Sequence, residues 1–156
     1  MSRLPLLARE EAPPASRAWY RADGSASALT RSLATAPDVL ETLMPFLRQI
    51  MGESSLDLAT KELVIARVSQ LNGCEYCIAS YRAAAIASLD ELAERERAIV
   101  DWVDRVTLDA ASVDGELTSR VLEHVREDEL VELTVLAGTI GMLNRYCTAF
   151  ELPPPR

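Results

Sequence analysis

A pair of cysteines in the middle of the chain constrains the fold more than any other feature. Cys74 and Cys77 stand three residues apart, directly after Asn72-Gly73 and between two stretches of apolar helical character. Asn-Gly is a common helix end, because glycine adopts the left-handed conformation there without strain. The stretch 57–87 therefore predicts a helical hairpin whose second helix begins at the cysteines.

The first helix of this hairpin is expected over residues 57–72 and is apolar around most of its circumference. Its apolar side chains are Leu58, Leu63, Val64, Ile65, Ala66, Val68 and Leu71. Such a helix lies at the centre of a domain or at a contact between subunits. We expect Ser54 or Ser55 to cap it, with Asp57 in its first turn. The second helix is expected over residues 75–88.

The rest of the chain also favours helices. Long stretches rich in Ala, Leu, Glu and Arg contain few glycines, a composition typical of all-α proteins. Further helices are expected over residues 16–21, 25–35, 37–51, 89–113, 119–126 and 129–150. The 89–113 stretch is either one helix or a short helix joined to a long one. No β-strand is predicted, so the expected fold class is all-α.

Local signals set the expected bounds of these helices. Pro45 predicts a kink or an early helix end, because proline lacks a backbone donor. Asp114-Gly115 predicts a turn. Thr118 and Asp128 are the expected caps of the last two helices.

The last helix contains two glycines and the third cysteine. Gly138 and Gly141 each cost about 1 kcal/mol relative to alanine in a helix interior, so we expect another helix to pack closely against them. Cys147 has Leu143 and Phe150 nearby, and we expect it to be buried and chemically inert.

Length and charge limit the architecture and the partners. A chain of 156 residues is one domain by length, with an N-terminal arm of short helices over 1–36, held by Trp19 and Tyr20, and a helical domain over 37–156. The net charge of −8 argues against nucleic acid and membrane surfaces as partners. No apolar run reaches the roughly 18 residues of a membrane span. Three cysteines without a signal peptide indicate a reducing, cytoplasmic location.

The cysteine pair indicates thiol redox chemistry. A helix N-terminus carries about half a positive charge, which favours the reactive thiolate form of Cys74 and Cys77. Their spacing places both sulfurs on one helical face, close enough to form a disulfide. One cysteine can attack a peroxide and become a sulfenic acid, which the other resolves to a disulfide.

A carboxylate and a phenol are expected beside the cysteines. Glu62 lies eleven residues before Gly73 and Tyr81 eight residues after it, so the two share nearly the same level of an antiparallel hairpin. Tyr81 is one turn beyond Cys77, and the order Glu62, Tyr81, Cys77 suggests a hydrogen-bonded relay. Apolar neighbours would raise the pKa of Glu62 and make it a proton acceptor.

Plainer interpretations of the same residues stay open. Two cysteines at this spacing also occur by chance in helices. A zinc site would need a second Cys/His pair, and the single His124 lies among charged residues. Glu62 beside Lys61 is also compatible with an ordinary surface position.

These residues together resemble the carboxymuconolactone decarboxylase and AhpD-like superfamily. The specific part is Glu62, eleven intervening residues and Cys74-Glu75-Tyr76-Cys77, within KELVIARVSQLNGCEYCIAS. The opening MSRLPLL and the later DELVELTVLAG and NRY are similar to its peroxidase-related branch, so the resemblance covers most of the chain.

The resemblance implies an all-α fold that assembles into trimers or hexamers and an alkylhydroperoxidase-type activity on small hydroperoxides. It implies that Cys77 is the peroxidatic cysteine, that Cys74 resolves it, and that Glu62 belongs to the proton relay. A dithiol donor, a lipoyl group or a thioredoxin-like protein, would supply electrons. Neither a metal nor another cofactor is needed.

Two tyrosines bear on that assignment. The family usually has histidine at Tyr81, and AhpD itself has histidine at Tyr76, where tyrosine is common among relatives. A phenol has a pKa near ~10 against ~6.5 for imidazole, so Tyr81 donates a hydrogen bond more readily than it accepts a proton. We therefore expect a thiol peroxidase that Tyr81 weakens or disables. The alternatives are a carboxymuconolactone decarboxylase-type enzyme and a non-enzymatic redox-sensing or scaffold oligomer.

Overall fold

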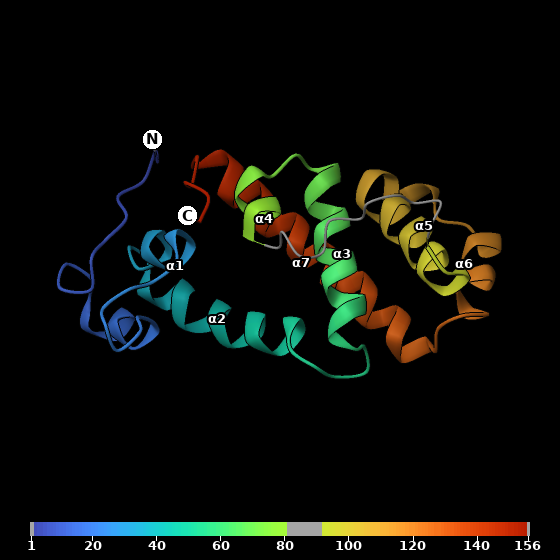
Figure 1. The fold of residues 1–156 in the computed structure, drawn as a ribbon, viewed down its shortest axis with the longest axis horizontal. Helices are drawn as coiled ribbons and strands as arrows, with labels where there is room; N and C mark the ends of the chain where they lie inside the picture. The colour runs from blue at the N-terminus through green and yellow to red at the C-terminus, as the bar shows by residue number, and fades with distance from the viewer. Residues whose placement is uncertain (1, 81–91, 156) are drawn as a thin grey trace.

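The computed structural model describes residues 2–80 and 92–155, and every regular element in these ranges is a helix (Figure 1). This confirms the all-α class. The elements in chain order are η1 (Pro14–Trp19), α1 (Ala28–Leu33), α2 (Pro37–Met51), α3 (Leu58–Leu71), α4 (Glu75–Ser80), α5 (Glu94–Asp109), η4 (Ala110–Ser112), α6 (Gly115–Leu122) and α7 (Glu127–Ala149).

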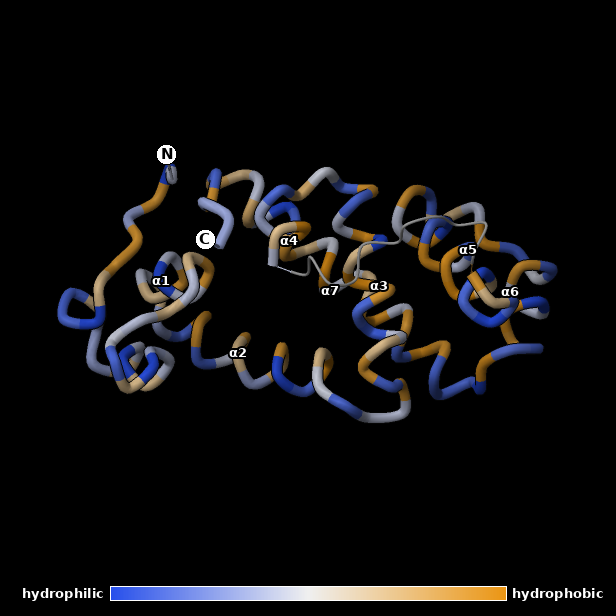
Figure 2. The backbone as a smooth tube through the Cα atoms, in the orientation of Figure 1, coloured by the Kyte–Doolittle hydropathy of each residue, from blue (hydrophilic) through white to orange (hydrophobic). Residues whose placement is uncertain are grey.

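Helices α3, α5 and α7 form the centre of the molecule. Helix α7 runs from α6 to the region of both chain termini (Figure 1), and α3 packs against α7, α5 and α4. The central position of α3 agrees with its many apolar side chains, of which Val64, Ile65, Ala66 and Val68 are buried. Orange and blue alternate along α2 and α5 (Figure 2), as expected for helices with one buried face. Fully buried side chains of this core include Val64, Val68, Ile99, Val103, Leu133 and Leu136.

The N-terminal arm is held by the aromatic residues that the sequence predicted. Tyr20 is buried, and its hydroxyl donates a hydrogen bond to the Leu7 carbonyl at 3.0 Å. The Arg48 guanidinium of α2 lies 4.7 Å from the centre of the Trp19 ring, a cation–π contact. The arm therefore packs along α2. Its separation from the helical domain at residue 36 stays a prediction.

The cap of α3 differs from the expected one. The Asp57 carboxylate accepts a hydrogen bond from the Thr60 backbone N–H at 2.8 Å, so Asp57 is the N-cap in place of Ser54 or Ser55. An aspartate at this position satisfies one of the free amides of the first turn. The Ser54 side chain instead contacts a buried lysine, Lys61.

The last two helices begin earlier than expected. Asp114 caps α6 by accepting from the Leu117 N–H at 2.8 Å, so the predicted turn is a helix start and Thr118 lies inside the helix. Asp128 is in the first turn of α7, whose cap is Arg126. Acidic residues stabilise the positive N-terminal end of a helix, which explains why Glu127, Asp128 and Glu129 form the first turn of α7.

Proline and glycine positions also correct the expectations. Helix α2 continues through Pro45 to Met51 without an early end. A side chain at Gly138 would meet no described atom within 4 Å, so the predicted close packing is wrong there. Gly141 is buried, and a side chain on it would lie 3.4 Å from the guanidinium of Arg145.

The helices on either side of the undescribed residues 81–91 are only partly comparable with the prediction. Helix α4 begins at Glu75 as expected and is described to Ser80, so its predicted continuation to residue 88 lies outside the described residues. Helix α5 begins at Glu94 and is followed by η4. None of the described helices has the length and apolar character needed to span a bilayer.

Candidate active site

The corner between α3 and α4 is formed by Gly73. Its φ of +62° is the left-handed conformation that ends a helix. The Gly73 N–H donates to the Gln70 carbonyl at 3.1 Å, and the Cys74 N–H donates to the Ser69 carbonyl at 3.0 Å. This pair of hydrogen bonds is the Schellman pattern. It delivers Cys74 to the start of α4, as the sequence predicted.

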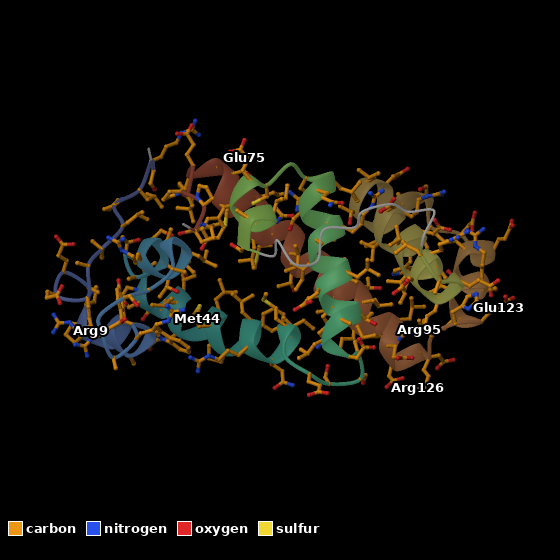
Figure 3. The ribbon with its side chains drawn as sticks, in the orientation of Figure 1. Arg9, Met44, Glu75, Arg95, Glu123 and Arg126 are labelled. Carbon is orange, nitrogen blue, oxygen red and sulfur yellow. The ribbon has the colours of Figure 1, made fainter. Side chains whose placement is uncertain are left out.

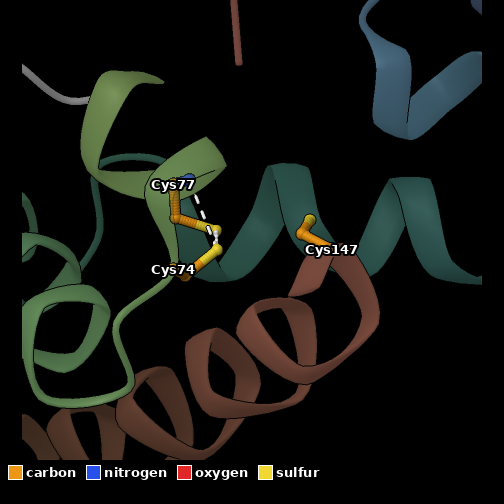
Figure 4. Close-up of side chains that lie close together, drawn as sticks. All are labelled: Cys74, Cys77 and Cys147. Atoms are coloured by element: carbon orange, nitrogen blue, oxygen red, sulfur yellow. Dashed lines mark hydrogen bonds between the residues drawn. The ribbon is translucent and has the colours of Figure 1, made fainter. Parts of the chain in front are cut away.

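Cys74 occupies the N-cap position of α4. Its sulfur accepts a hydrogen bond from the Cys77 backbone N–H at 3.4 Å, as a cap side chain does. The two sulfurs lie 2.7 Å apart (Figure 4), and both cysteines are buried, free thiols. The prediction that both sulfurs share one face of the helix is confirmed.

A third cysteine joins this pair from a distant part of the chain. Cys147 projects from α7 (Figure 4), and the sulfurs of Cys74, Cys77 and Cys147 all lie within 4.8 Å of one another. Cys147 is 2% exposed, so its predicted burial is confirmed. Its place in the sulfur cluster was missed, because no local sequence signal shows which helix packs beside the corner.

The cluster places its negative charge on Cys74. Hydrogen bonds from the thiols of Cys147 and Cys77 hold the pKa of Cys74 well below its usual range, and the Cys77 N–H and Thr148 add to the effect. The pKa of Cys147 is raised by its hydrogen bonds to Cys74 and Cys77 and by burial. Cys74 is therefore the resting thiolate, and Cys147 stays protonated.

Cys77 behaves differently from Cys74. Hydrogen bonding to Cys147 lowers the pKa of Cys77, but the hydrogen bond to Cys74, burial and the charge of Cys74 together raise it. At 2.7 Å the Cys74 thiolate is positioned to take the Cys77 proton. The pair therefore shares one proton, and its titration belongs to both residues.

Polar side chains from α3 and α7 support the corner. Asn144 is 1% exposed, accepts a hydrogen bond from the Asn72 amide at 3.0 Å and donates to the Ser69 hydroxyl at 3.2 Å. Asn144 also hydrogen-bonds Cys77, which lowers the pKa of that thiol. The sequence signal for this role was a polar residue one turn before Cys147 in an apolar helix.

Cys77 opens onto an apolar cavity of about 400 Å³ between five helices. Its walls come from α1, α2, α3, α4 and α7, and most of the lining is hydrophobic. The lining residues are Ser27, Leu29, Thr30, Met44, Leu47, Arg48, Met51, Ile65, Ser69, Tyr76, Cys77, Ser80, Ile140, Leu143 and Cys147. A cavity of this size accommodates a small organic molecule.

A second hollow also borders α4. This groove of about 470 Å³ is lined by Cys74, Cys147 and Glu75 together with the C-terminal segment that follows α7. In Figure 3, Glu75 lies on the outer side of α4. Met44 lies on α2, one of the helices that line the cavity. The sulfur cluster thus stands between a cavity and a groove.

The other predicted site residues are only partly placed. Tyr76 lines both the cavity and the groove, and its hydroxyl accepts from the Leu29 N–H at 3.5 Å. Glu62 is exposed, on the face of α3 that carries Ile65 and Ser69 farther along. The apolar enclosure expected for its carboxylate is not found among the described residues. Tyr81 lies outside the described residues, so the relay stays a prediction.

Among the described residues, the three sulfurs also form a group of possible metal ligands. Two thiolates that share a zinc ion at ~2.3 Å stand roughly 3.8 Å apart. The Cys74–Cys77 separation of 2.7 Å is shorter. The geometry therefore fits a reactive thiol pair better than a preformed zinc site.

We predict that the reduced protein contains a thiolate at neutral pH and that Cys74 carries it. Because its pKa is lowered, the thiolate persists as the pH falls below the usual range of cysteine and is lost only at more acidic pH. The ultraviolet absorbance of the thiolate during a pH titration measures this. Cys74→Ser should change the titration, because the Cys74 thiolate is removed and Cys77 keeps the hydrogen bond to Cys147 that lowers its pKa without the neighbouring charge that raises it. An unchanged titration in Cys74→Ser would place the charge on another sulfur.

Comparison with known proteins finds a family match over the middle of the chain, which includes Cys74 and Cys77. The model of the carboxymuconolactone decarboxylase family matches residues 37–113, which include α2, α3, α4 and α5. The uncharacterized protein YdfG of Bacillus subtilis (strain 168) is 29% identical over 131 residues, which cover 73% of this chain and 88% of YdfG.

Solved structures share the fold over nearly the whole chain. One is the alkylhydroperoxidase AhpD core of an uncharacterized peroxidase-related protein from Ralstonia eutropha JMP134, with a TM-score of 0.88 and 18% identity over 99% of this chain and 92% of that one. Another is the debrominase Bmp8, with a TM-score of 0.80 and 18% identity over 99% of this chain and 93% of that one. At such identities the likeness shows a common fold.

Proposed function

We propose that this chain, which belongs to the carboxymuconolactone decarboxylase and AhpD-like superfamily, is a thiol peroxidase that reduces organic hydroperoxides through Cys74 and Cys77. The observation that carries the proposal is the thiol pair itself. Two free sulfurs 2.7 Å apart stand at a helix start, and one of them opens onto an apolar cavity. Relatives described as peroxidase-related support the same chemistry.

The proposed reaction divides the work between the two cysteines. The Cys77 sulfur attacks the peroxide, a sulfur–oxygen bond forms, and the oxygen–oxygen bond breaks. Cys74 takes the Cys77 proton across their 2.7 Å contact, and the departing alkoxide takes a proton from solvent and leaves as an alcohol. Cys74 then attacks the sulfenic acid, which releases water and forms a disulfide. A dithiol donor returns the pair to thiols.

The cavity favours a hydroperoxide with an apolar body. Hydrogen peroxide needs little of a space of about 400 Å³, whereas an aryl or alkyl group would be held by Leu29, Met44, Ile65 and Leu143. Burial of such a group contributes roughly 25 cal/mol per Å² of apolar surface. We therefore place organic hydroperoxides ahead of hydrogen peroxide as substrates.

Reductive debromination is a second candidate for the same thiols. Bmp8, which shares the fold, is described as a debrominase and in one structure is bound to 2,3,4-tribromopyrrole. The apolar cavity beside Cys77 also suits a flat halogenated ring. Two thiols supply the two electrons that convert a carbon–bromine bond into a carbon–hydrogen bond and bromide, with a disulfide as the other product.

The two earlier alternatives have less support. A carboxymuconolactone decarboxylase-type site needs a cation or a histidine for the substrate carboxylate. Among the described residues the cavity offers Arg48, which already lies over Trp19, and His124 is not in its lining. A redox-sensing or scaffold oligomer would keep the dithiol without turnover, and the assay below separates it from an enzyme.

The proposal is tested by mixing the reduced protein with cumene hydroperoxide in a stopped-flow instrument and counting thiols before and after. We expect two thiols per chain to be lost, at a rate well above that of a free thiol. Cys77→Ser should abolish the fast reaction, while near-ultraviolet circular dichroism confirms that the variant is folded. Fast oxidation that survives in Cys77→Ser would refute Cys77 as the attacking residue. If the wild type is oxidised no faster than a free thiol is, the result favours a redox sensor or scaffold. If the protein reacts with tribromopyrrole and not with the hydroperoxide, the result favours debromination.

Several further features of the proposed enzyme stay predictions. They are a lipoyl or thioredoxin-like dithiol donor, assembly into a trimer or hexamer, a cytoplasmic location and the relay from Glu62 through Tyr81. Exposed apolar side chains on α2 and α7 support assembly with other copies. They are Val39, Phe46, Val131, Val135 and Met142.

A further inference from the structure

We propose that Cys147 is a third redox thiol, which forms a disulfide with Cys77 and so joins α7 to α4 in the oxidised protein. The inference rests on the proposed function of Cys74 and Cys77, and it assigns Cys147 a role that neither the family motif nor its position in the chain indicates. It is carried by the position of three sulfurs between the cavity and the groove.

The surroundings of each sulfur place Cys147 within reach of both other cysteines. Cys77 lines the cavity and Cys74 lines the groove, whereas Cys147 lines both. Cys147 therefore shares one hollow with each of the other two cysteines, and all three sulfurs lie within 4.8 Å of one another. These three are all the cysteines of the chain, so any intramolecular disulfide must use two of them.

Thiol–disulfide exchange supplies the step without an added reactant. Once the Cys74–Cys77 disulfide has formed, the Cys147 sulfur attacks Cys77. A Cys147–Cys77 bond forms, the Cys74–Cys77 bond breaks, and its electron pair leaves on Cys74. The proton of Cys147 is released to solvent or to Cys74. One disulfide is present before and after, so no net oxidation or reduction occurs.

The direction of the exchange follows from the leaving group. A thiol of lower pKa leaves faster from a disulfide. In the reduced site the thiols of Cys147 and Cys77 are the main groups that stabilise the Cys74 thiolate. Once these two are joined, the Cys77 N–H, 3.4 Å from the Cys74 sulfur, remains as a donor to it. Attack on Cys77 releases this sulfur. Attack on Cys74 would release Cys77, whose thiolate is disfavoured by burial.

The proposed disulfide has a consequence that the local pair lacks. A Cys74–Cys77 bond closes a loop within one helical turn. A Cys77–Cys147 bond instead links α4 to the far end of α7, two elements about 70 residues apart in the chain, and long loops restrict the unfolded chain most. Oxidation should therefore raise the melting temperature of the wild type more than that of Cys147→Ser.

The decisive experiment counts thiols at the end of oxidation in variants without Cys74. Cys74→Ser treated with a small excess of cumene hydroperoxide should still lose two thiols, because Cys147 condenses with the Cys77 sulfenic acid and releases water. The double variant Cys74→Ser/Cys147→Ser should lose one thiol and keep a sulfenic acid that dimedone traps. End points are compared because loss of the Cys74 thiolate slows the first step in both variants.

Peptide mapping identifies the pair in the wild-type protein. After an acid quench and alkylation, trypsin leaves Cys74 and Cys77 on residues 68–82 and Cys147 on residues 146–156. We expect these two peptides to be linked in part of the oxidised sample. Further cleavage after Glu75 or Tyr76 should assign the link to Cys77, with Cys74 alkylated.

The outcomes separate this inference from the proposed function. One outcome would overturn the role of Cys147 and leave the peroxidase proposal intact. In it, the wild type loses two thiols, Cys147 is alkylated in every sample, and Cys74→Ser loses only one thiol. Absence of any rapid thiol loss in the wild type would overturn the peroxidase proposal itself. A link from Cys147 to Cys74 would contradict the direction of exchange proposed above.

Discussion

Replacing Lys61 with methionine is expected to lower the free energy of unfolding by about 3–5 kcal/mol, the range for removing one partner of a buried ion pair. Lys61 is 1% exposed and lies in α3. Its ammonium donates to the Glu132 carboxylate at 2.6 Å, to the Ile50 carbonyl at 2.9 Å and to the Ser54 hydroxyl at 2.7 Å. Methionine fills a similar volume but leaves these acceptors without a donor.

The position of Lys61 explains why the effect should be large. The Gly52 carbonyl also accepts from the Lys61 ammonium, so one side chain holds the end of α2, the segment that follows it and α7 together. Glu132 adds a hydrogen bond from the Leu56 N–H at 3.2 Å. Loss of Lys61 therefore leaves a carboxylate with little solvent access and no cation, which is the costly half of a broken pair.

Urea denaturation followed by circular dichroism measures this effect, and the chain contains a matched control. Arg3 pairs with Glu151 at 2.5 Å, but both side chains are about half exposed. Arg3→Met should change the unfolding free energy by less than about 1 kcal/mol. Lys61→Met/Glu132→Leu, which removes both charges, should recover part of the loss. A cost for Lys61→Met as small as that for Arg3→Met would show that the buried contacts do not hold the helices.

Lys61 and Glu62 also show where the sequence could not locate the site. The sequence placed Glu62 in apolar surroundings and treated Lys61 as its surface neighbour, yet the structure buries the lysine and exposes the glutamate. A helix that is apolar on most sides does not indicate which of two adjacent charges faces inward. Lys61 faces inward because it pairs with Glu132, which is 71 residues away from Lys61 in the chain.

The corner itself was predictable because its causes are local. Asn72-Gly73 ends α3 by a preference of the backbone, and the next residue must then start α4. The third sulfur was not predictable in the same way. Cys147 reaches the corner only because α7 packs across α3 and α4, and the packing of one helix on another depends on the whole apolar surface.

The start of α3 was less predictable than its end. Ser54, Ser55 and Asp57 all suit an N-cap, and only the course of the preceding chain selects Asp57. Ser54 is unavailable because its hydroxyl lies against Lys61 and Glu132. Contacts with distant residues therefore decide which of several suitable residues caps the helix. The sequence shows the candidate caps but not which of them is used.

Replacing Met44 with tryptophan is expected to reduce kcat/KM for cumene hydroperoxide by about 10–100-fold, the size of a pocket misfit of ~1–3 kcal/mol, with little change for hydrogen peroxide. Met44 lies on α2 (Figure 3) and lines the cavity opposite Cys77. It is partly exposed, so the larger ring can enter the cavity with less strain than at a fully buried position. A small peroxide still reaches the sulfur past the ring, whereas an aryl group loses its space.

The control for this variant lies on the same helix. Phe46 is 44% exposed and borders an outer apolar groove with Val39 and Met142, away from the cavity lining. Phe46→Trp adds a tryptophan to α2 without filling the cavity, so its kcat/KM should match the wild type for both peroxides. An equal loss for both peroxides in Met44→Trp would indicate damage to the thiol pair. A substrate held in this cavity must compete with the new ring for the same volume. If Met44→Trp kept the wild-type preference between cumene hydroperoxide and hydrogen peroxide, organic hydroperoxides would therefore reach Cys77 by another route.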